Sequence, residues 1–344
     1  MKPYPMKFVP VYKEKVWGGR TLEQLGRELP GGPDAQIGES WELVDLATTS
    51  VSGGGGGSER SVIANGVLAG KTLAEAIALM GDGVMGYLPL SDDGGFPILL
   101  KYLDANENLS VQVHPSPEYA ASHDDAFLKS ESWYIVDRRP GATIYKGIHE
   151  GVTPEQMRAA LEANTDEAVV PLMIEVPVEP GDCHYLPSGT CHALGGGILV
   201  AEVQTPSDTT FRVYDWGRTG RELHVEQAIA CIDFGPVDTG EIEKRVVREG
   251  EGVKMTRLVN CEHFVLEKVE AEAGFGDEVG GGATAQPMAW MVVAGGLTLG
   301  ELELVAGDTL LLPAGMDAAA VSVGDEGASW LEVRFPKAES GALA

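Results

Sequence analysis

The chain has 344 residues, of which 44% are hydrophobic and 22% charged, and a formal net charge of −27 at pH 7. This composition is typical of a globular protein, and the negative charge argues against nucleic acid or an anionic membrane as a partner. No run approaches the roughly 18 apolar residues of a membrane span, and the first residues have no apolar core or small-residue cleavage site, so we do not expect export. The four cysteines form no C-x-x-C pair, so we expect reduced thiols and a cytoplasmic protein.

The first hundred residues alternate short apolar runs with helical patterns. Residues 8–12 and 40–44 have the composition of strands, and a helix is expected at about 21–28. Apolar residues recur at helical spacing in the segment around 72–90. Residues 96–103 then form a continuous apolar run, which predicts a buried strand.

The next strand, LSVQVHP at 109–115, has two polar side chains on one face. Val111 and Val113 point to one side, and Gln112 and His114 point to the other. Pro115 ends the strand because it has no N–H to donate to a neighbouring strand. Two side chains that can bind metal on one face of an otherwise apolar strand indicate a functional position.

Further helical segments are expected around 116–128 and 153–164, the second beginning at a Thr cap followed by Pro. From residue 169 the chain is expected to be mostly β, apart from a helix at about 222–231. His224 lies where that helix begins, and we expect it to have a structural role.

An internal repeat indicates the architecture. Segments 176–192 and 302–318 both contain Gly-Asp, then four residues, then Pro-x-Gly. The third residue after the glycine of Pro-x-Gly is His192 in the first segment and Ala318 in the second. The first copy matches the second motif of the cupin double-stranded β-helix. The chain therefore resembles a mainly β protein with two cupin-like jelly-roll barrels, the C-terminal one reduced and metal-free, and a small helical insertion. We expect a catalytic domain at 1–235 and a degenerate cupin-like β domain at 236–344.

Four side chains are candidates for one metal site. Gln112 and His114 come from one strand, His192 from the cupin motif, and Glu131 from the run KSESWYI between them. A catalytic metal needs about three or four protein ligands and one open position. Two histidines, one carboxylate and one amide oxygen suit Zn²⁺, although manganese, iron or cobalt would also fit.

A second polar cluster follows on two later strands. Glu202 and Gln204 share one strand face, and Arg212 is expected to share a face with Thr210 and Tyr214. A carboxylate can act as a base beside a carbonyl group, and a guanidinium can hold the oxyanion that develops there.

These motifs together resemble the type I mannose-6-phosphate isomerase family in its short bacterial form. LSVQVHP, KSESWYI, PGDCHYLPSGTCHALGGG and SDTTFRVYDWGR occur in the family's order, with WGGR and IGESWEL near the start. The resemblance spans roughly residues 5–336. It implies a metal-dependent aldose–ketose isomerase of carbohydrate metabolism, which interconverts mannose 6-phosphate and fructose 6-phosphate through a cis-enediol.

The resemblance also implies roles for individual residues. One zinc ion per chain would be held by Gln112, His114, Glu131 and His192. The implied catalytic residues are Arg212, Glu202 and Lys129, and the implied substrate-binding residues are Lys101, Ser110 and Trp17. The identity of the general base and of the phosphate-binding residues stays open.

Three other functions remain compatible with the motifs. The nearest is an isomerase of an unphosphorylated sugar, which differs by lacking a basic phosphate site. The second is a sugar-binding cupin without turnover, and the third is a cupin dioxygenase, for which a His-rich iron site is more typical. We expect a small phosphosugar as the partner, and the sequence does not indicate an oligomeric state.

Overall fold

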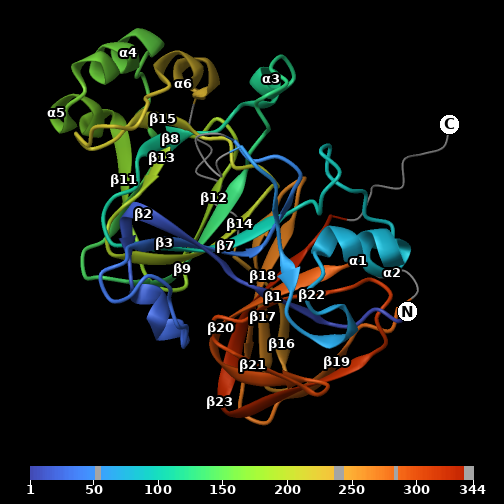
Figure 1. Ribbon diagram of the computed structural model, residues 1–344. Helices are drawn as coiled ribbons and strands as arrows, with labels where there is room; N and C mark the ends of the chain where they lie inside the picture. Colours follow the sequence, from blue (N-terminus) through green and yellow to red (C-terminus); the bar gives the residue numbers. More distant parts are fainter. Residues whose placement is uncertain (51–55, 236–243, 283–285, 337–344) are drawn as a thin grey trace. The chain divides into compact units, whose positions relative to one another are not determined.

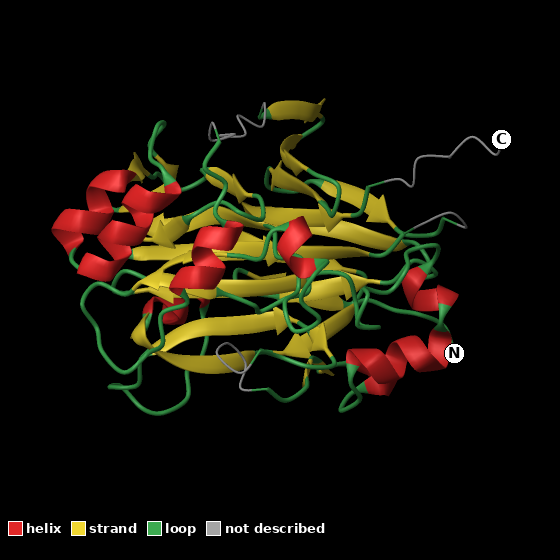
Figure 2. Cartoon of the chain, turned by 90° about the horizontal axis from the view of Figure 1, so that it is seen from above, coloured by secondary structure: helices red, strands yellow, loops and turns green. Residues whose placement is uncertain are grey.

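The computed structural model describes residues 1–50, 56–235, 244–282 and 286–336. The protein is mainly β, as predicted (Figures 1 and 2), and its described helices are short. None of the helices among the described residues is long and apolar enough to cross a membrane.

The chain divides into two compact units that are not contiguous in sequence. The larger unit contains the described residues of Pro10–Arg60 and Ser91–Glu241, and the smaller unit those of Met1–Val9, Ser61–Leu90 and Ile242–Ala344. We expected one boundary, between residues 235 and 236, and the observed division differs from it. The first strand pairs with strands of the smaller unit on both of its sides, so the N-terminus and residues 61–90 belong with the last third of the chain.

The larger unit contains a six-stranded, a five-stranded and a two-stranded sheet. The six-stranded order is β12-β9-β14-β7-β3-β2, with bounds Cys183–Leu186, Glu131–Arg138, Ile198–Gln204, Leu99–Ala105, Ile37–Leu43 and Val11–Gly19. The five-stranded order is β11-β10-β13-β8-β15, with bounds Met173–Pro177, Thr143–Ile148, His192–Leu194, Val111–Val113 and Phe211–Tyr214. The two-stranded sheet pairs β4 (Asp45–Leu46) with β5 (Glu59–Arg60).

The smaller unit contains one antiparallel sheet with the order β16-β17-β18-β23-β20-β22-β1-β6. In this order the eight strands have the bounds Arg245–Gly250, Val253–Asn260, Val265–Ala271, Ala319–Arg334, Met288–Leu299, Thr309–Leu312, Met6–Val9 and Val62–Ile63. Two further strands pair at its sides, β19 (Gly276–Val279) with β23 and β21 (Leu302–Val305) with β20.

In the larger unit, the six- and five-stranded sheets share one apolar core. Trp133 and Val200 from the first sheet pack in the same cluster as Ile144 and Leu194 from the second. A second cluster joins strands of the five-stranded sheet to helices α4 (Pro154–Ala163), α5 (Asp166–Val169) and α6 (Val225–Cys231), which gather beside that sheet in Figure 1. The result is a β-sandwich with helices packed against one sheet.

The helices agree with prediction where the chain has both a cap and a buried face. Thr72 and Thr153 each form a capping box, and they begin α1 (Leu73–Met80) and α4. Elsewhere the helices are shorter than expected. The segment 116–128 has only α3 (Pro117–Ala120), which buries none of its residues, so no packing extends it. The remaining short turns are α2 (Asp82–Met85) and the 3₁₀ helices Thr21–Leu25, Gly66–Leu68 and Val170–Leu172.

The repeat seen in the sequence has a counterpart in strand pairing. In the larger unit Trp133 lies opposite Glu202 on one side and His184 on the other. In the smaller unit Trp290 lies opposite Glu332 and Leu310, the residue that aligns with His184 in the repeat. Both tryptophans donate their indole N–H to the paired glutamate at 3.0 Å. The repeated segments therefore occupy the same place in two similar strand arrangements.

The capping box of α4 gives a stability prediction. Thr153→Ala removes the hydroxyl that accepts the Gln156 N–H, and we expect a loss of about 1 kcal/mol in the free energy of unfolding, measured by urea denaturation. The control is Thr165→Ala, because Thr165 caps α5 without a side-chain hydrogen bond. Equal losses in both variants would contradict the capping role.

Candidate metal centre and adjoining pocket

The predicted ligands come from both sheets of the sandwich and meet at its inside. Gln112 lies on β8, opposite His192 at the start of β13. His114 follows β8 directly, and Glu131 begins β9 in the other sheet. The ligating atoms of His114, Glu131 and His192 lie within 4.8 Å of one another, and all three residues are buried. No other such group of three occurs among the described residues.

Both histidines present the same ring nitrogen to the centre. His114 Nδ1 lies 3.1 Å from the Thr209 carbonyl oxygen, and His192 Nδ1 lies 2.7 Å from that of Thr190. Because a carbonyl only accepts, each Nδ1 carries the proton and donates it, which leaves Nε2 as a lone-pair donor. The two Nε2 atoms are 3.4 Å and 3.2 Å from the Glu131 carboxylate oxygens.

Glu131 is a fully buried carboxylate with cationic and imidazole neighbours. Lys129 Nζ lies 2.7 Å from Oε2. Although burial opposes ionisation, the charge of Lys129 and the nearby His114 hold the pKa of Glu131 well below its usual range. Burial, followed by the charge of Lys129, lowers the pKa of His114 to about 3, so this imidazole is neutral at physiological pH. An anionic carboxylate and a neutral imidazole are the forms that bind metal.

Gln112 adds an amide to the same group. Its Nε2 lies 3.2 Å from His192 Nε2, and rotating the amide by half a turn presents Oε1 in the same place. Unlike the other three residues, Gln112 also lines the neighbouring pocket. It therefore lies between the buried cluster and the space that a ligand can enter.

The cluster fits a divalent metal. His114 Nε2 and both Glu131 oxygens are buried and make no hydrogen bond of normal geometry with described residues. Buried polar atoms that make no hydrogen bond are destabilising, and a divalent cation bound between these three atoms would satisfy them together. The donor set of two imidazoles, one carboxylate and one amide suits zinc or another borderline divalent ion.

A pocket of about 280 Å³ adjoins the cluster. All six residues predicted to be catalytic or to bind substrate line it: Trp17, Lys101, Ser110, Lys129, Glu202 and Arg212. The structure thus brings the predicted catalytic and substrate-binding side chains together in one cavity, with the predicted ligand Gln112 in its wall.

Glu202 is buried in the wall of this pocket. One carboxylate oxygen accepts the Trp133 indole N–H at 3.0 Å, and the other lies 3.4 Å from Lys101 Nζ. Burial and, after it, the charge of Glu131 raise the pKa of Glu202 above its usual range, although Lys101 and Lys129 oppose this. A carboxyl group with a raised pKa can exchange protons near neutral pH.

Arg212 points into the pocket from β15, but Tyr214 does not accompany it. A bulge between Arg212 and Tyr214 disturbs the pairing with β8, and Tyr214 packs in the apolar cluster beside Phe211 and Val213. The expectation that Arg212 and Tyr214 share a face was wrong, because the extra residue of a bulge shifts the alternation of side chains. The sequence shows no signal of this bulge.

Sequence analysis missed other charged residues in the wall of the pocket, among them Glu39, Lys15 and Arg221. Lys15 Nζ lies 3.1 Å from Glu39, and the Trp41 indole donates to the same carboxylate at 2.5 Å. Despite burial, the charges of Lys15 and Lys101 lower the pKa of Glu39 to about 2. The motif IGESWEL contains both Glu39 and Trp41, and their spacing of two on one strand was the signal available.

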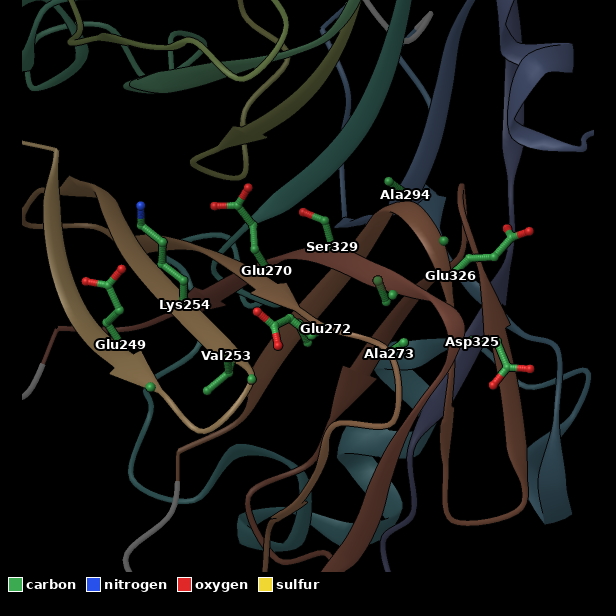
Figure 3. Close-up of a pocket in the computed structure, with 16 residues that line it drawn as sticks. Glu249, Val253, Lys254, Glu270, Glu272, Ala273, Ala294, Asp325, Glu326 and Ser329 are labelled. Atoms are coloured by element: carbon green, nitrogen blue, oxygen red, sulfur yellow. The ribbon is translucent and has the colours of Figure 1, made fainter.

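The smaller unit has a separate hollow of about 800 Å³ (Figure 3). Its lining is acidic, with Glu249, Glu270, Glu272, Asp325 and Glu326 against Lys254. Figure 3 shows these carboxylates distributed around the hollow. Because like charges repel, this surface is unsuited to an anionic ligand.

Comparison with known proteins identifies relatives of this chain. Residues 6–140 match the family model of the phosphomannose isomerase type I catalytic domain. The chain is 36% identical over 277 residues to mannose-6-phosphate isomerase ManA of Bacillus subtilis, covering 78% of this chain and 80% of that protein. It is 35% identical over 315 residues to a mannose-6-phosphate isomerase of Streptococcus mutans, covering 87% and 89%.

Solved structures show the same similarity. The crystal structure of mannose 6-phosphate isomerase from Bacillus subtilis superposes with a TM-score of 0.81 and 30% identity, over 97% of this chain and 100% of that one. A putative mannosephosphate isomerase from Archaeoglobus fulgidus superposes with a TM-score of 0.72 at 22% identity, over 98% of this chain and 100% of that one, which supports the fold alone.

The metal centre predicts the effect of removing a ligand. We expect Glu131→Ala and His192→Ala to lose bound metal, measured by mass spectrometry of the purified protein, because each removes one donor from a small set. Arg212→Ala should retain it. The control is His123→Ala, which changes an exposed histidine outside the cluster. Full metal occupancy in the Glu131 and His192 variants would exclude this site.

Proposed function

The chain belongs to the type I phosphomannose isomerase family, and on that premise we propose how its own residues carry out the reaction. The enzyme is an aldose–ketose isomerase that interconverts mannose 6-phosphate and fructose 6-phosphate. The observation that carries the proposal is the continuity between cluster and pocket. Gln112 and Lys129 both line the pocket. Gln112 also lies 3.2 Å from His192, and Lys129 lies 2.7 Å from Glu131.

We assign the cluster to one Zn²⁺ ion held by Gln112, His114, Glu131 and His192. The donor set supports this choice, since zinc takes imidazole nitrogen and carboxylate oxygen together. When bound there, a divalent ion would supply Lewis-acid polarisation of the sugar oxygens, which would make the neighbouring C–H more acidic. With one carboxylate among the ligands, the site keeps a net positive charge that attracts sugar oxygens.

Glu202 is the proposed base that moves the proton between C1 and C2. Its carboxylate lines the pocket, is held by Trp133 and has a pKa raised by burial, all of which suit a group that takes up and releases a proton. Lys129 keeps its proton, since the charges of Glu131 and Glu202 raise its pKa against the effect of burial. It can therefore donate a hydrogen bond to a substrate oxygen while Glu202 accepts a proton.

Arg212 is proposed to hold the negative charge that develops on the enediolate oxygens. Its Nη1 donates to the Glu222 carbonyl at 2.8 Å, whereas its buried Nε makes no hydrogen bond with described residues. The positive charges of Arg221 and Arg218 lie nearby and, together with the larger effect of burial, lower its pKa from the usual range. Asp215 pairs with both Arg218 and Arg221, but the three guanidinium groups together outnumber it, so this wall favours an anionic sugar in a protein of net charge −27.

Trp17, Lys101 and Ser110 are proposed to bind the substrate from the remaining walls. Two of the three lysines that line the pocket, Lys101 and Lys15, are cations that a phosphate can approach, although each already has a carboxylate partner. The four cysteines are free thiols, which supports a cytoplasmic location for the enzyme.

The proposed activity can be tested by following fructose 6-phosphate formation from mannose 6-phosphate before and after chelation. We expect turnover that chelation abolishes and Zn²⁺ restores, with no comparable turnover of mannose. Arg212→Ala should lower kcat by roughly 10²-fold or more while keeping its metal, because it removes a charge used in the transition state.

Each alternative predicts a different result in that assay. Turnover of mannose alone would identify an isomerase of free sugars. Metal binding without turnover of either sugar would favour a binding protein. A metal-free Arg212→Ala variant would contradict the role assigned to Arg212.

The pair of Lys101 and Glu202 predicts a change in pH dependence. Lys101 lowers the pKa of Glu202 from 3.4 Å away, so Lys101→Met should raise that pKa and shift the acidic limb of kcat/KM to higher pH. The KM for mannose 6-phosphate should also rise. The control is Lys13→Met: Lys13 lies over the same Trp41 ring, at 5.0 Å against 4.7 Å for Lys101, but pairs with Glu59. An unshifted acidic limb in Lys101→Met would exclude Glu202 as the base.

A further inference from the structure

The backbone of Arg212 lies at an open edge of its sheet. β15 is the last strand of the five-stranded order, and β8 is its neighbour there. Arg212 is paired with Gln112 on β8, but its own N–H and C=O point away from that strand. At an edge such groups normally face water, and the strand is free to shift.

Here both groups are bound by one residue. His224 Nδ1 accepts the Arg212 N–H at 3.1 Å, and the His224 N–H donates to the Arg212 carbonyl at 2.8 Å. Two residues earlier, the Glu222 carbonyl accepts the guanidinium Nη1 at 2.8 Å. A segment of three residues therefore holds Arg212 at its backbone and at the end of its side chain.

Helix geometry does not account for a histidine at this position. His224 is the N-cap residue of α6, but its side chain makes no capping hydrogen bond. The residues that cap helices well are Ser, Thr, Asp and Asn, whose side chains turn back onto the first turn. The imidazole instead turns toward β15, where its ring lies 6.0 Å from that of Phe211.

We propose that His224 is a positioning residue for Arg212, which fixes the edge of β15 so that the guanidinium meets the reacting oxygens. The proposal rests on the catalytic role of Arg212 given above. His224 lines a second hollow, whose wall shares Thr210, Arg212 and Arg221 with the catalytic pocket. It is not among the residues that line the catalytic pocket, so it acts on the substrate only through Arg212.

The contact requires a neutral ring. Because Nδ1 accepts a hydrogen bond, the proton of neutral His224 is on Nε2. Burial and the charge of Arg212 lower the pKa of His224, while Glu222 opposes this. Asp124, Asp125 and Arg221 line the same hollow. Protonation of Nδ1 would place a donor against the Arg212 N–H and break their hydrogen bond. At low pH the edge of β15 would therefore lose this contact.

Two substitutions separate the hydrogen bond from the size of the side chain. His224→Leu removes the acceptor, and His224→Asn keeps an acceptor, Oδ1, the same number of bonds from Cα as Nδ1. We expect His224→Leu to lower kcat on the order of 10²-fold with unchanged metal content and a KM within about twofold, as for a displaced catalytic group. His224→Asn should restore most of the loss. The control His149→Leu changes an exposed histidine and should keep full activity.

The pH dependence and a double variant complete the test. The ratio of kcat/KM in His224→Asn to that in the native enzyme should rise as the pH falls through the His224 pKa, because asparagine does not titrate. Arg212→Ala with His224→Leu should be no slower than Arg212→Ala alone.

Three results would overturn the proposal: a native kcat in His224→Leu, no recovery in His224→Asn together with a constant ratio, or losses that multiply in the double variant. Failure of the proposed function looks different. In that case Arg212→Ala alone keeps native turnover, whatever the His224 variants do.

Discussion

The larger unit depends on a buried negative charge. Glu131 is completely enclosed between the sheets, and an isolated carboxylate in such a place would be strongly destabilising. Lys129 compensates it directly, whereas the two imidazoles turn the lone pairs of their Nε2 atoms toward it. The compensation is incomplete without a cation, since His114 Nε2 and both Glu131 oxygens make no hydrogen bond with described residues. A cation bound in this cluster would therefore stabilise the folded unit.

The β-sandwich makes that compensation possible. One sheet contributes Glu131, and the other contributes Gln112, His114 and His192. Strand pairing fixes Gln112 opposite His192, and two backbone carbonyls orient the imidazoles. Ligands on strands of two packed sheets lose little freedom on binding, so the site is formed before a metal or substrate arrives.

The smaller unit shows how the same strand arrangement can lack this chemistry. Its Trp290–Glu332 pair reproduces the Trp133–Glu202 pair of the larger unit. The strand on the other side of the glutamate differs. In the larger unit Lys101 lies opposite Glu202, whereas in the smaller unit Glu267 lies opposite Glu332. Burial raises the pKa of Glu332, and the nearby Glu267 adds to that effect against Arg334. The shared register supports the fold in both units, whereas the charged residues beside it determine whether a site results.

Much of the site could be predicted because strand alternation is local. The alternation in LSVQVHP placed Gln112 and His114 on one face, and the repeated Gly-Asp and Pro-x-Gly pattern identified His192 and the aligned Ala318. The ligand set and the pocket residues Trp17, Lys101 and Ser110 came from motifs whose order resembles a known family. The structure brings all of them to one place.

The sequence by itself determined the mainly β class, the capped helices and the residues that can bind metal, because these depend on local spacing and side-chain chemistry. Only the tertiary structure decided which distant segments meet. It assigned the N-terminal strand to the smaller unit, turned Tyr214 into the core at a bulge, and placed His224 against the backbone of Arg212. Those outcomes depend on sheet edges and long-range pairing, which no local pattern of residues encodes.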